Sequence, residues 1–306
     1  MELSNTRGQA TSPSNRLVQM MRRHPLLCYF LLAFCLTWAF ELLALLLWHP
    51  YHGMAPILLL GPALSALLMT AVLEGKPGVG RLLRRYVLWR VGLRWYQVVL
   101  LGIPALILLS ALTVPGAIAT FRAPTPLFLL TSVLIYFIIL TLGGPLGEEL
   151  GWSGFALPRL QQGHGPLAGT LLLGSLWGLW HLPLFLFIPG FNGAGTGFLG
   201  ISLPFVEFVI FAIALRFLIT WVFNNVGGSL LLVLLLHTSY NAGFFLLLSL
   251  VRLVNVNVYL VFVAAAVLII VATRGRLGYD HSQRETVLPA PVTDREQKPG
   301  TVGTSV

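Results

Sequence analysis

The sequence predicts an all-α, polytopic membrane protein, a bundle of about eight transmembrane helices. Of its 306 residues, 57% are hydrophobic and only 9% are charged, whereas soluble domains carry about 25% charged residues. The mean hydropathy of the chain is +0.85. Apolar stretches also recur along the chain at lengths near the roughly 20 residues that a helix needs to cross a bilayer.

Eight such stretches follow one another in the sequence. They cover about residues 25–48, 54–74, 95–120, 126–147, 166–189, 200–223, 228–250 and 256–272. The first stretch follows a basic start, is too long for the apolar region of a signal peptide and lacks a cleavage-like site, so we expect it to remain as a helix. Cys28 and Cys35 lie seven residues apart in it and are expected to be ordinary buried thiols.

The placement of Lys and Arg predicts the orientation, because positively charged loops are retained on the cytoplasmic side. With the N-terminus inside, 16 of the 19 basic residues fall in inner segments. Arg122 and Arg252 fall in outer loops, and Arg216 lies within a span. We therefore expect an integral protein of the cell membrane with both termini in the cytoplasm. The net charge of +9 then reflects topology and gives no support for nucleic-acid binding, while membrane lipids are expected partners of the basic loop 76–94.

Composition divides the chain into five parts. Residues 1–24 and 276–306 are polar, basic and rich in Ser, Thr, Pro and Gly, and we expect them to be disordered cytoplasmic tails. Residues 25–125 hold the N-terminal transmembrane helices, and residues 251–275 hold the last one. Between them, residues 126–250 form a region in which polar side chains interrupt apolar helices.

The segment 148–164 interrupts this region, since it holds two Glu, a Pro, an Arg, two Gln and a His. We expect an amphipathic helix at the cytoplasmic interface, with Trp152 and Phe155 facing lipid or core. Gly174 and Gly178 lie four residues apart in the next span. Small residues at that spacing predict a close approach between helix backbones.

Ionisable residues inside membrane spans are costly and by default mark functional sites. The candidates are Glu41, the adjacent Glu148 and Glu149, His181, Glu207 with Arg216, and His237. Asn241 follows His237 by four residues and so projects from the same helix face. Each residue alone would be explained by a hydrogen bond between helices. Together, the carboxylate pair, the lone histidine and the His/Asn pair predict a site to which three helices contribute.

These residue types suit peptide-bond hydrolysis. A carboxylate can take a proton from water, and a neutral imidazole can orient that water or protonate the leaving amine. His and Asn side chains can donate hydrogen bonds to the oxyanion of the tetrahedral intermediate. Glu148, His181 and His237 are also acceptable zinc ligands that leave a position for water. A divalent metal therefore stays an open alternative.

Three segments carry a family resemblance: "EELGWSGFALPRLQ" from Glu148, "WGLWHLP" around His181 and "HTSYN" from His237. They resemble the three motifs of the CPBP family, which comprises the CAAX-type prenyl endopeptidases and bacteriocin-processing or self-immunity membrane proteins, also called the Abi family. The resemblance covers about residues 130–245. It implies a bundle of about eight helices with a cavity open to the membrane, in which residues 126–250 form the catalytic core.

The resemblance also implies roles for individual residues. Glu148, the first carboxylate of the motif, resembles the water-activating group with His181 beside it, and Glu149 is the second carboxylate. His237 and Asn241 resemble the oxyanion-hole pair. In the metalloprotease alternative, Glu148, His181 and His237 would hold the metal. The implied substrate is a hydrophobic or membrane-anchored peptide, whose sequence and prenylation the motifs do not reveal.

One position departs from the family pattern. The motif has an Arg four residues after its second Glu, whereas Ser153 stands there in this chain. A family member without activity, acting as an immunity or scaffold protein, is therefore an alternative, as is a transporter. The substitution also creates "GWSG", which is similar to the G-x-S-G of rhomboid serine proteases. A rhomboid-like Ser would begin a fully buried helix, whereas we expect residues 151–154 to open an interfacial segment.

Without that Arg, the carboxylate of Glu149 needs another partner. An unpaired ionised carboxylate near hydrocarbon costs several kcal/mol, so the group should protonate or find a cation. Arg216 needs a counter-ion of its own inside the membrane. We therefore predict an ion pair between Glu149 and Arg216, with Arg159 as the other candidate cation.

Overall fold

A computed structural model of the chain describes residues 13–47, 60–113, 116, 119, 121–188, 191, 194–250 and 258–280. These residues form helices joined by turns, and no strand occurs among them. The all-α prediction is therefore confirmed. The outer parts of the two predicted tails, residues 1–12 and 281–306, lie outside the described residues.

Three of the helical runs change helix type without a break. In chain order the helices are α1 (Pro13–Arg23), α2 (Pro25–Leu47), α4 (Gly61–Arg84), η1 (Arg85–Val87), α5 (Leu93–Gln97), η2 (Val98–Gly102), α6 (Ile103–Leu112), α8 (Pro126–Leu142), α9 (Pro145–Glu149), η3 (Leu150–Ala156), α10 (Leu157–Trp180), α11 (Leu182–Phe187), α12 (Gly197–Asn225), α13 (Leu230–Leu250) and α14 (Val258–Ala272). The element η1 is a 3-10 helix, whereas η2 and η3 are π-helices.

Five helical segments are long and apolar enough to cross a membrane. They are Pro25–Leu43, Leu93–Leu112, Pro145–Phe187, Gly197–Asn225 and Leu230–Leu247. The helices α8 and α14 are apolar but shorter. The stretch predicted at 54–74 lies partly outside the described residues, and its described part belongs to α4. The prediction of a polytopic helical membrane protein is confirmed, with five of the described helical segments meeting the criteria for a full span.

Large apolar side chains cover the outside of the bundle, as a hydrocarbon environment requires. On α8, Leu127, Leu130 and Ile138 are 71%, 59% and 58% exposed. A soluble monomer rarely exposes contiguous apolar patches of that kind. The exposed apolar surface therefore agrees with the membrane assignment made from composition.

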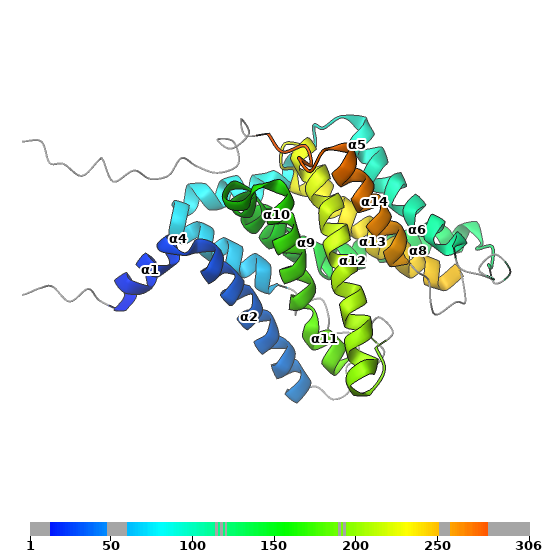
Figure 1. Cartoon of the computed structure of the whole chain (residues 1–306), viewed down its shortest axis with the longest axis horizontal. Helices are drawn as coiled ribbons and strands as arrows, with labels where there is room; N and C mark the ends of the chain where they lie inside the picture. The colour runs from blue at the N-terminus through cyan, green and yellow to red at the C-terminus, as the bar shows by residue number, and fades with distance from the viewer. Residues whose placement is uncertain are drawn as a thin grey trace, which may run out of the picture.

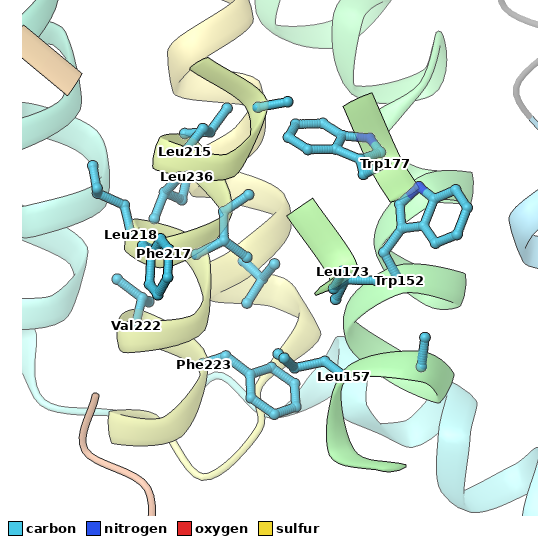
Figure 2. Close-up of a cluster of buried hydrophobic side chains, with 14 of the residues drawn as sticks. Trp152, Leu157, Leu173, Trp177, Leu215, Phe217, Leu218, Val222, Phe223 and Leu236 are labelled. Carbon is cyan, nitrogen blue, oxygen red and sulfur yellow. The ribbon is translucent and has the colours of Figure 1, made fainter. Parts of the chain in front are cut away.

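The centre of the bundle is formed by α10, α12 and α13, with α2 and α4 on one side and α6, α8 and α14 on the other (Figure 1). The backbones of α10 and α12 approach closely at two glycines. A Cβ atom on Gly174 would lie 2.8 Å from Ile213 Cα, and one on Gly178 would lie 3.1 Å from Val209 Cα. The predicted packing role of these glycines is confirmed. Figure 2 shows the apolar core that results, with η3 and α10 facing α12 and α13.

The expected tails are shorter than the sequence suggested, because both contain residues that pack on the bundle. Residues 13–23 of the predicted N-terminal tail form α1, whose Met21 is buried. At the other end, Leu277 is fully buried, and its carbonyl oxygen accepts a hydrogen bond of 3.1 Å from Nδ2 of Asn224. A few apolar side chains at the correct spacing are sufficient to fix these short segments.

The expectation of an interfacial amphipathic helix over 148–164 is wrong for its first half. Every residue from Leu150 to Ala156 is buried, whereas a helix lying in the interface would expose one polar face. Trp152 and Phe155 face the core and are both 0% exposed. The segment can be buried because its carboxylates find partners on other helices.

The orientation predicted from the basic residues can be tested at Gly80, which is exposed and has no atom within 4 Å of a Cβ built on it. Cys28 is buried as predicted, but the prediction is wrong for Cys35, which is exposed. With both replaced by Ala, Gly80→Cys should react with a membrane-impermeant maleimide only from the cytoplasmic side. Arg122→Cys, in the predicted outer loop, is the matched control and should react only from outside. Labelling of position 80 from the outer face would contradict the topology.

Candidate active site

Glu149 is the centre of a buried polar cluster to which three parts of the bundle contribute. Nη1 of Arg216, on α12, lies 3.1 Å from Oε2 of Glu149, and Nη2 lies 3.4 Å from Oε1. From α13, Nδ1 of His237 lies 2.9 Å from Oε1. The hydroxyl of Ser153 donates a hydrogen bond to Oε2. The predicted ion pair between Glu149 and Arg216 is confirmed, and both side chains are 0% exposed.

Ser153 and Arg216 together replace the arginine that the family motif places after its second Glu. Nη1 of Arg216 donates to Oγ of Ser153 at 3.2 Å, so the hydroxyl joins Arg216 to the carboxylate of Glu149. The positive charge thus comes from α12 instead of from the same helical run. A small side chain at position 153 is needed because a second arginine would compete for the space that Arg216 occupies.

The other candidate cation, Arg159, has a different partner. Its Nη2 lies 2.7 Å from Oε1 of Glu74, on α4, and its guanidinium carbon lies 3.8 Å from the centroid of the Phe155 ring. Arg159 therefore joins α10 to α4 and is not the counter-ion of Glu149.

Trp177 connects the remaining groups of the cluster and was missing from the residues predicted for the site. Its Nε1 donates to Oε2 of Glu148 at 2.6 Å. The guanidinium carbon of Arg216 lies 4.4 Å from the centroid of its ring, and the ring is edge-on to both His181 and His237, with centroids 5.6 and 5.4 Å apart. The sequence spacing could have identified Trp177, because it lies four residues before His181 and residues four apart share a helix face.

His181 is held by the backbone and by aromatic rings at the end of α10. Nδ1 of His181 lies 2.8 Å from the carbonyl oxygen of Trp177. A carbonyl oxygen accepts, so Nδ1 carries the proton and Nε2 has the lone pair in the neutral ring. The rings of Trp180 and Phe208 pack against the imidazole, with centroid distances of 4.8 and 4.9 Å. These contacts fix its orientation.

His237 and Asn241 lie on successive turns of α13. Because Nδ1 of His237 faces a carboxylate, it is the donor in that hydrogen bond and Nε2 is left for another partner. The side chain of Asn241 is partly buried and makes no hydrogen bond with the described part of the chain. Both groups thus retain capacity for a bound molecule.

The two adjacent glutamates have different environments. Glu149 contacts a guanidinium, an imidazole and a hydroxyl, whereas Trp177 is the one hydrogen-bond partner of Glu148 among the described residues. No basic side chain of the described chain lies within ion-pair distance of Glu148. Glu148 is 3% exposed, so it is a buried carboxylate without a direct counter-ion. Environments of this kind set adjacent carboxylates to different roles.

The helical turn that carries this pair is fixed by close contacts around η3. A Cβ atom on Gly151 would lie 2.6 Å from the carbonyl oxygen of Pro62, on α4. Arg85 donates hydrogen bonds of 3.0 Å to the carbonyl oxygens of Gly154 and Gly228, which join η3 to the turn before α13. Burial lowers the pKa of Arg85 to about 10, so its side chain remains charged at neutral pH. Single π-helical turns are frequent at functional sites.

The other predicted ionisable residues do not contribute to the cluster. Glu207 is exposed on α12, and Glu41 is buried on α2. Neither is a partner of Glu149, whose contacts come from Ser153, Arg216 and His237. The structure therefore brings five of the predicted ionisable residues together, namely Glu148, Glu149, His181, Arg216 and His237. Their catalytic roles stay predictions.

No group of three or more His, Cys, Asp and Glu side chains in the described segments is arranged to hold a metal ion. In both His181 and His237, Nδ1 already has a hydrogen-bond partner within the protein. The zinc set of Glu148, His181 and His237 stays a prediction.

Comparison with known proteins gives two matches. The sequence profile of the family described as "Type II CAAX prenyl endopeptidase Rce1-like" matches residues 130–243. The "CAAX prenyl protease 2" of Methanococcus maripaludis is 26% identical over 200 residues, which cover 62% of this chain and 72% of that protein. The resemblance to CAAX-type prenyl endopeptidases is confirmed. The segment that matches the CAAX endopeptidase profile begins in α8 and ends in α13, so it contains the whole Glu149 cluster. Neither match concerns the Abi branch, which stays a prediction.

Arg216→Ala should destabilise the protein by about 3–5 kcal/mol, because it leaves the carboxylate of Glu149 buried without a counter-ion. In that background, Ser153→Arg should restore part of the loss, since the new guanidinium lies four residues from Glu149 and can occupy the space that Arg216 leaves. Thermal unfolding of the purified proteins in detergent measures both effects. The exposed Arg276 provides the control variant, Arg276→Ala, which should unfold like the wild type. A harmless Arg216→Ala, or a double variant no better than the single one, would contradict the assignment.

Proposed function

We propose that this chain is an intramembrane endopeptidase of CAAX type that hydrolyses a peptide bond in a hydrophobic or membrane-anchored peptide. The observation that carries the proposal is that Trp177 contacts both Glu148 and His181. Its indole N–H donates a hydrogen bond to Glu148, and its carbonyl oxygen accepts one from Nδ1 of His181. A carboxylate and an imidazole fixed beside each other in a buried site are the groups that water activation requires. The matches to CAAX prenyl endopeptidases support the same reaction class.

Glu148 is the residue that we assign as the general base. One of its oxygens accepts a hydrogen bond from Nε1 of Trp177, and no cation of the described chain is paired with it. Its other oxygen, Oε1, has no hydrogen-bond partner among the described residues. Glu148 therefore has an oxygen available for the attacking water, whereas both oxygens of Glu149 already accept hydrogen bonds.

His181 is assigned to orient that water and to supply a proton to the leaving amine. Its Nδ1 proton is directed to the carbonyl oxygen of Trp177, so the lone pair of Nε2 is on the opposite side of the ring. Packing of Trp180 and Phe208 against the imidazole limits its rotation. The ring is thereby set in one orientation before the substrate binds.

Glu149 is assigned a positioning role instead of a direct one. Both of its oxygens already accept hydrogen bonds from Arg216, and one of them also accepts from His237. When its ring carries both protons, His237 donates from Nδ1 to Glu149 and has the Nε2 proton left for a bound molecule. His237 and the amide of Asn241 can then donate hydrogen bonds to the oxyanion.

The proposed reaction balances without a further reactant. The water oxygen attacks the carbonyl carbon of the scissile bond while its proton passes to Glu148, and the oxyanion accepts hydrogen bonds from His237 and Asn241. The carbon–nitrogen bond then breaks as Glu148 returns that proton to the leaving amine, either directly or through Nε2 of His181. The products are a new carboxyl terminus and a new amino terminus, and the protein returns to its starting protonation state.

The contacts of Ser153 and Arg216 argue against two alternatives, a serine protease and an inactive family member. A serine nucleophile needs a base that accepts its proton, but the hydroxyl of Ser153 contacts Glu149 and Arg216, and neither His181 nor His237 is bonded to it. An inactive immunity or scaffold protein was suggested by the loss of the motif arginine. Arg216 supplies the missing positive charge from α12, which removes the main reason to expect inactivity.

Glu148→Gln, His181→Ala and His237→Ala should each lower turnover by about 100-fold or more, as expected for loss of a proton-transfer group or an oxyanion donor, while Ser153→Ala should remain active. Hydrolysis of a fluorogenic CAAX peptide, with and without a farnesyl group, by protein in liposomes is the measurement. Glu207→Gln, at an exposed position on α12, is the control. An inactive Ser153→Ala together with fluorophosphonate labelling of the wild type would favour a serine mechanism. Metal analysis of the same preparations tests the divalent-metal alternative.

Trp177→Phe should lower the rate by about 10- to 100-fold, because a hydrogen bond to a charged group contributes roughly 1.5–3 kcal/mol. The substitution keeps an aromatic ring beneath Arg216 but removes the N–H that fixes Glu148. A variant with the wild-type rate would show that the Trp177 donor does not position Glu148.

A further inference from the structure

Helix α1 has two chemically different faces. Met21 is buried against the bundle, while Leu17, Val18 and Met20 are 50%, 37% and 49% exposed on the same apolar side. The opposite side carries the polar and basic residues of the helix, which has no acidic residue in its sequence PSNRLVQMMRR. An exposed apolar strip beside a basic one is typical of helices that lie in a membrane interface.

The position of α1 relative to the first membrane helix agrees with an interfacial location. The chain bends at His24, and α2, a candidate span from Pro25, begins at the next residue. Figure 1 shows α1 turning away from the axis of α2 at this point. A candidate span that begins at Pro25 places the last turn of α1 next to the membrane surface.

A basic pocket lies along this part of the chain. Its lining residues are Arg16, Gln19, Met20, Arg22, Arg23 and His24. Arg22 and Arg23 have no carboxylate within ion-pair distance among the described residues. Guanidinium groups bind phosphate oxygens through charge-assisted hydrogen bonds. The pocket therefore has the chemistry of a phosphate site, next to an exposed apolar strip.

We infer that α1 is a lipid-binding helix, in which Arg16, Arg22 and Arg23 hold the phosphate groups of anionic lipids while Leu17, Val18 and Met20 enter the acyl region. A bilayer surface offers negative charge and hydrocarbon side by side, which the two faces of α1 require together. A soluble acidic protein would satisfy the arginines but would leave the apolar strip in water. The proposal concerns a surface outside the Glu149 cluster and does not depend on the proposed protease activity.

The number of arginines on α1 sets the expected strength of its binding to anionic lipid. Each Lys or Arg near an anionic surface strengthens binding by about five-fold. Replacing all three arginines by Gln should therefore weaken the association of α1 with anionic lipid by about 100-fold. The association should also weaken as salt is raised, because exposed charges are screened.

Hydrogen exchange of the full chain in nanodiscs tests the inference directly. The α1 amides should exchange more slowly in discs that contain phosphatidylglycerol than in discs of phosphatidylcholine alone. The variant Arg16→Gln/Arg22→Gln/Arg23→Gln should remove that difference. The matched control is Arg122→Gln/Arg274→Gln/Arg276→Gln, three exposed arginines outside both α1 and the basic loop 76–94, which should preserve it.

Three outcomes would overturn the inference. Equal exchange of α1 in neutral and anionic discs would show that anionic lipid is not its partner. Protection that increases when two copies share one neutral disc would identify a second copy of the chain as the occupant. An anionic-lipid effect that survives in the triple variant would assign the effect to other residues. Native mass spectrometry of the same proteins should find fewer retained phosphatidylglycerol molecules on the triple variant than on the control.

Discussion

The ion pair between Glu149 and Arg216 joins α9 to α12 in the interior of the bundle, where neither side chain is exposed. In such an environment each charge alone is costly, so the positions of the two helices are coupled to the pairing of the two groups. The same guanidinium lies over Trp177, whose indole N–H holds Glu148. The geometry of the candidate active site therefore depends on this one interaction.

The surroundings of the two carboxylates differ, although the residues are neighbours of one type. Glu149 accepts hydrogen bonds from Arg216 and His237 on both of its oxygens. Glu148 has a single neutral donor among the described residues, Trp177, which bonds one of its oxygens. In the proposed reaction the well-paired group supports the cluster and the less satisfied group reacts. This division is the reason for assigning the base to Glu148.

Much of the fold and part of the site could be predicted from the sequence. Hydropathy identified the helical segments, the spacing of Gly174 and Gly178 predicted a close helix contact, and burial cost alone indicated that Arg216 would pair with Glu149. Other features depend on three-dimensional packing. The complete burial of η3 follows from partners supplied by distant helices, so its polar residues were misread as interfacial. The order in α1 and the linking role of Trp177 likewise come from contacts outside the local pattern.

A double-mutant cycle on Glu149→Gln and Arg216→Met, followed by thermal unfolding, tests most directly whether these two groups form the pair on which the site depends. Each single variant should be strongly destabilised, since it leaves one buried charge or dipole without its partner. The double variant should be no less stable than either single variant, because both members of the pair are removed together. Destabilisations that simply add would show that the two groups act independently, which would contradict the account of the site.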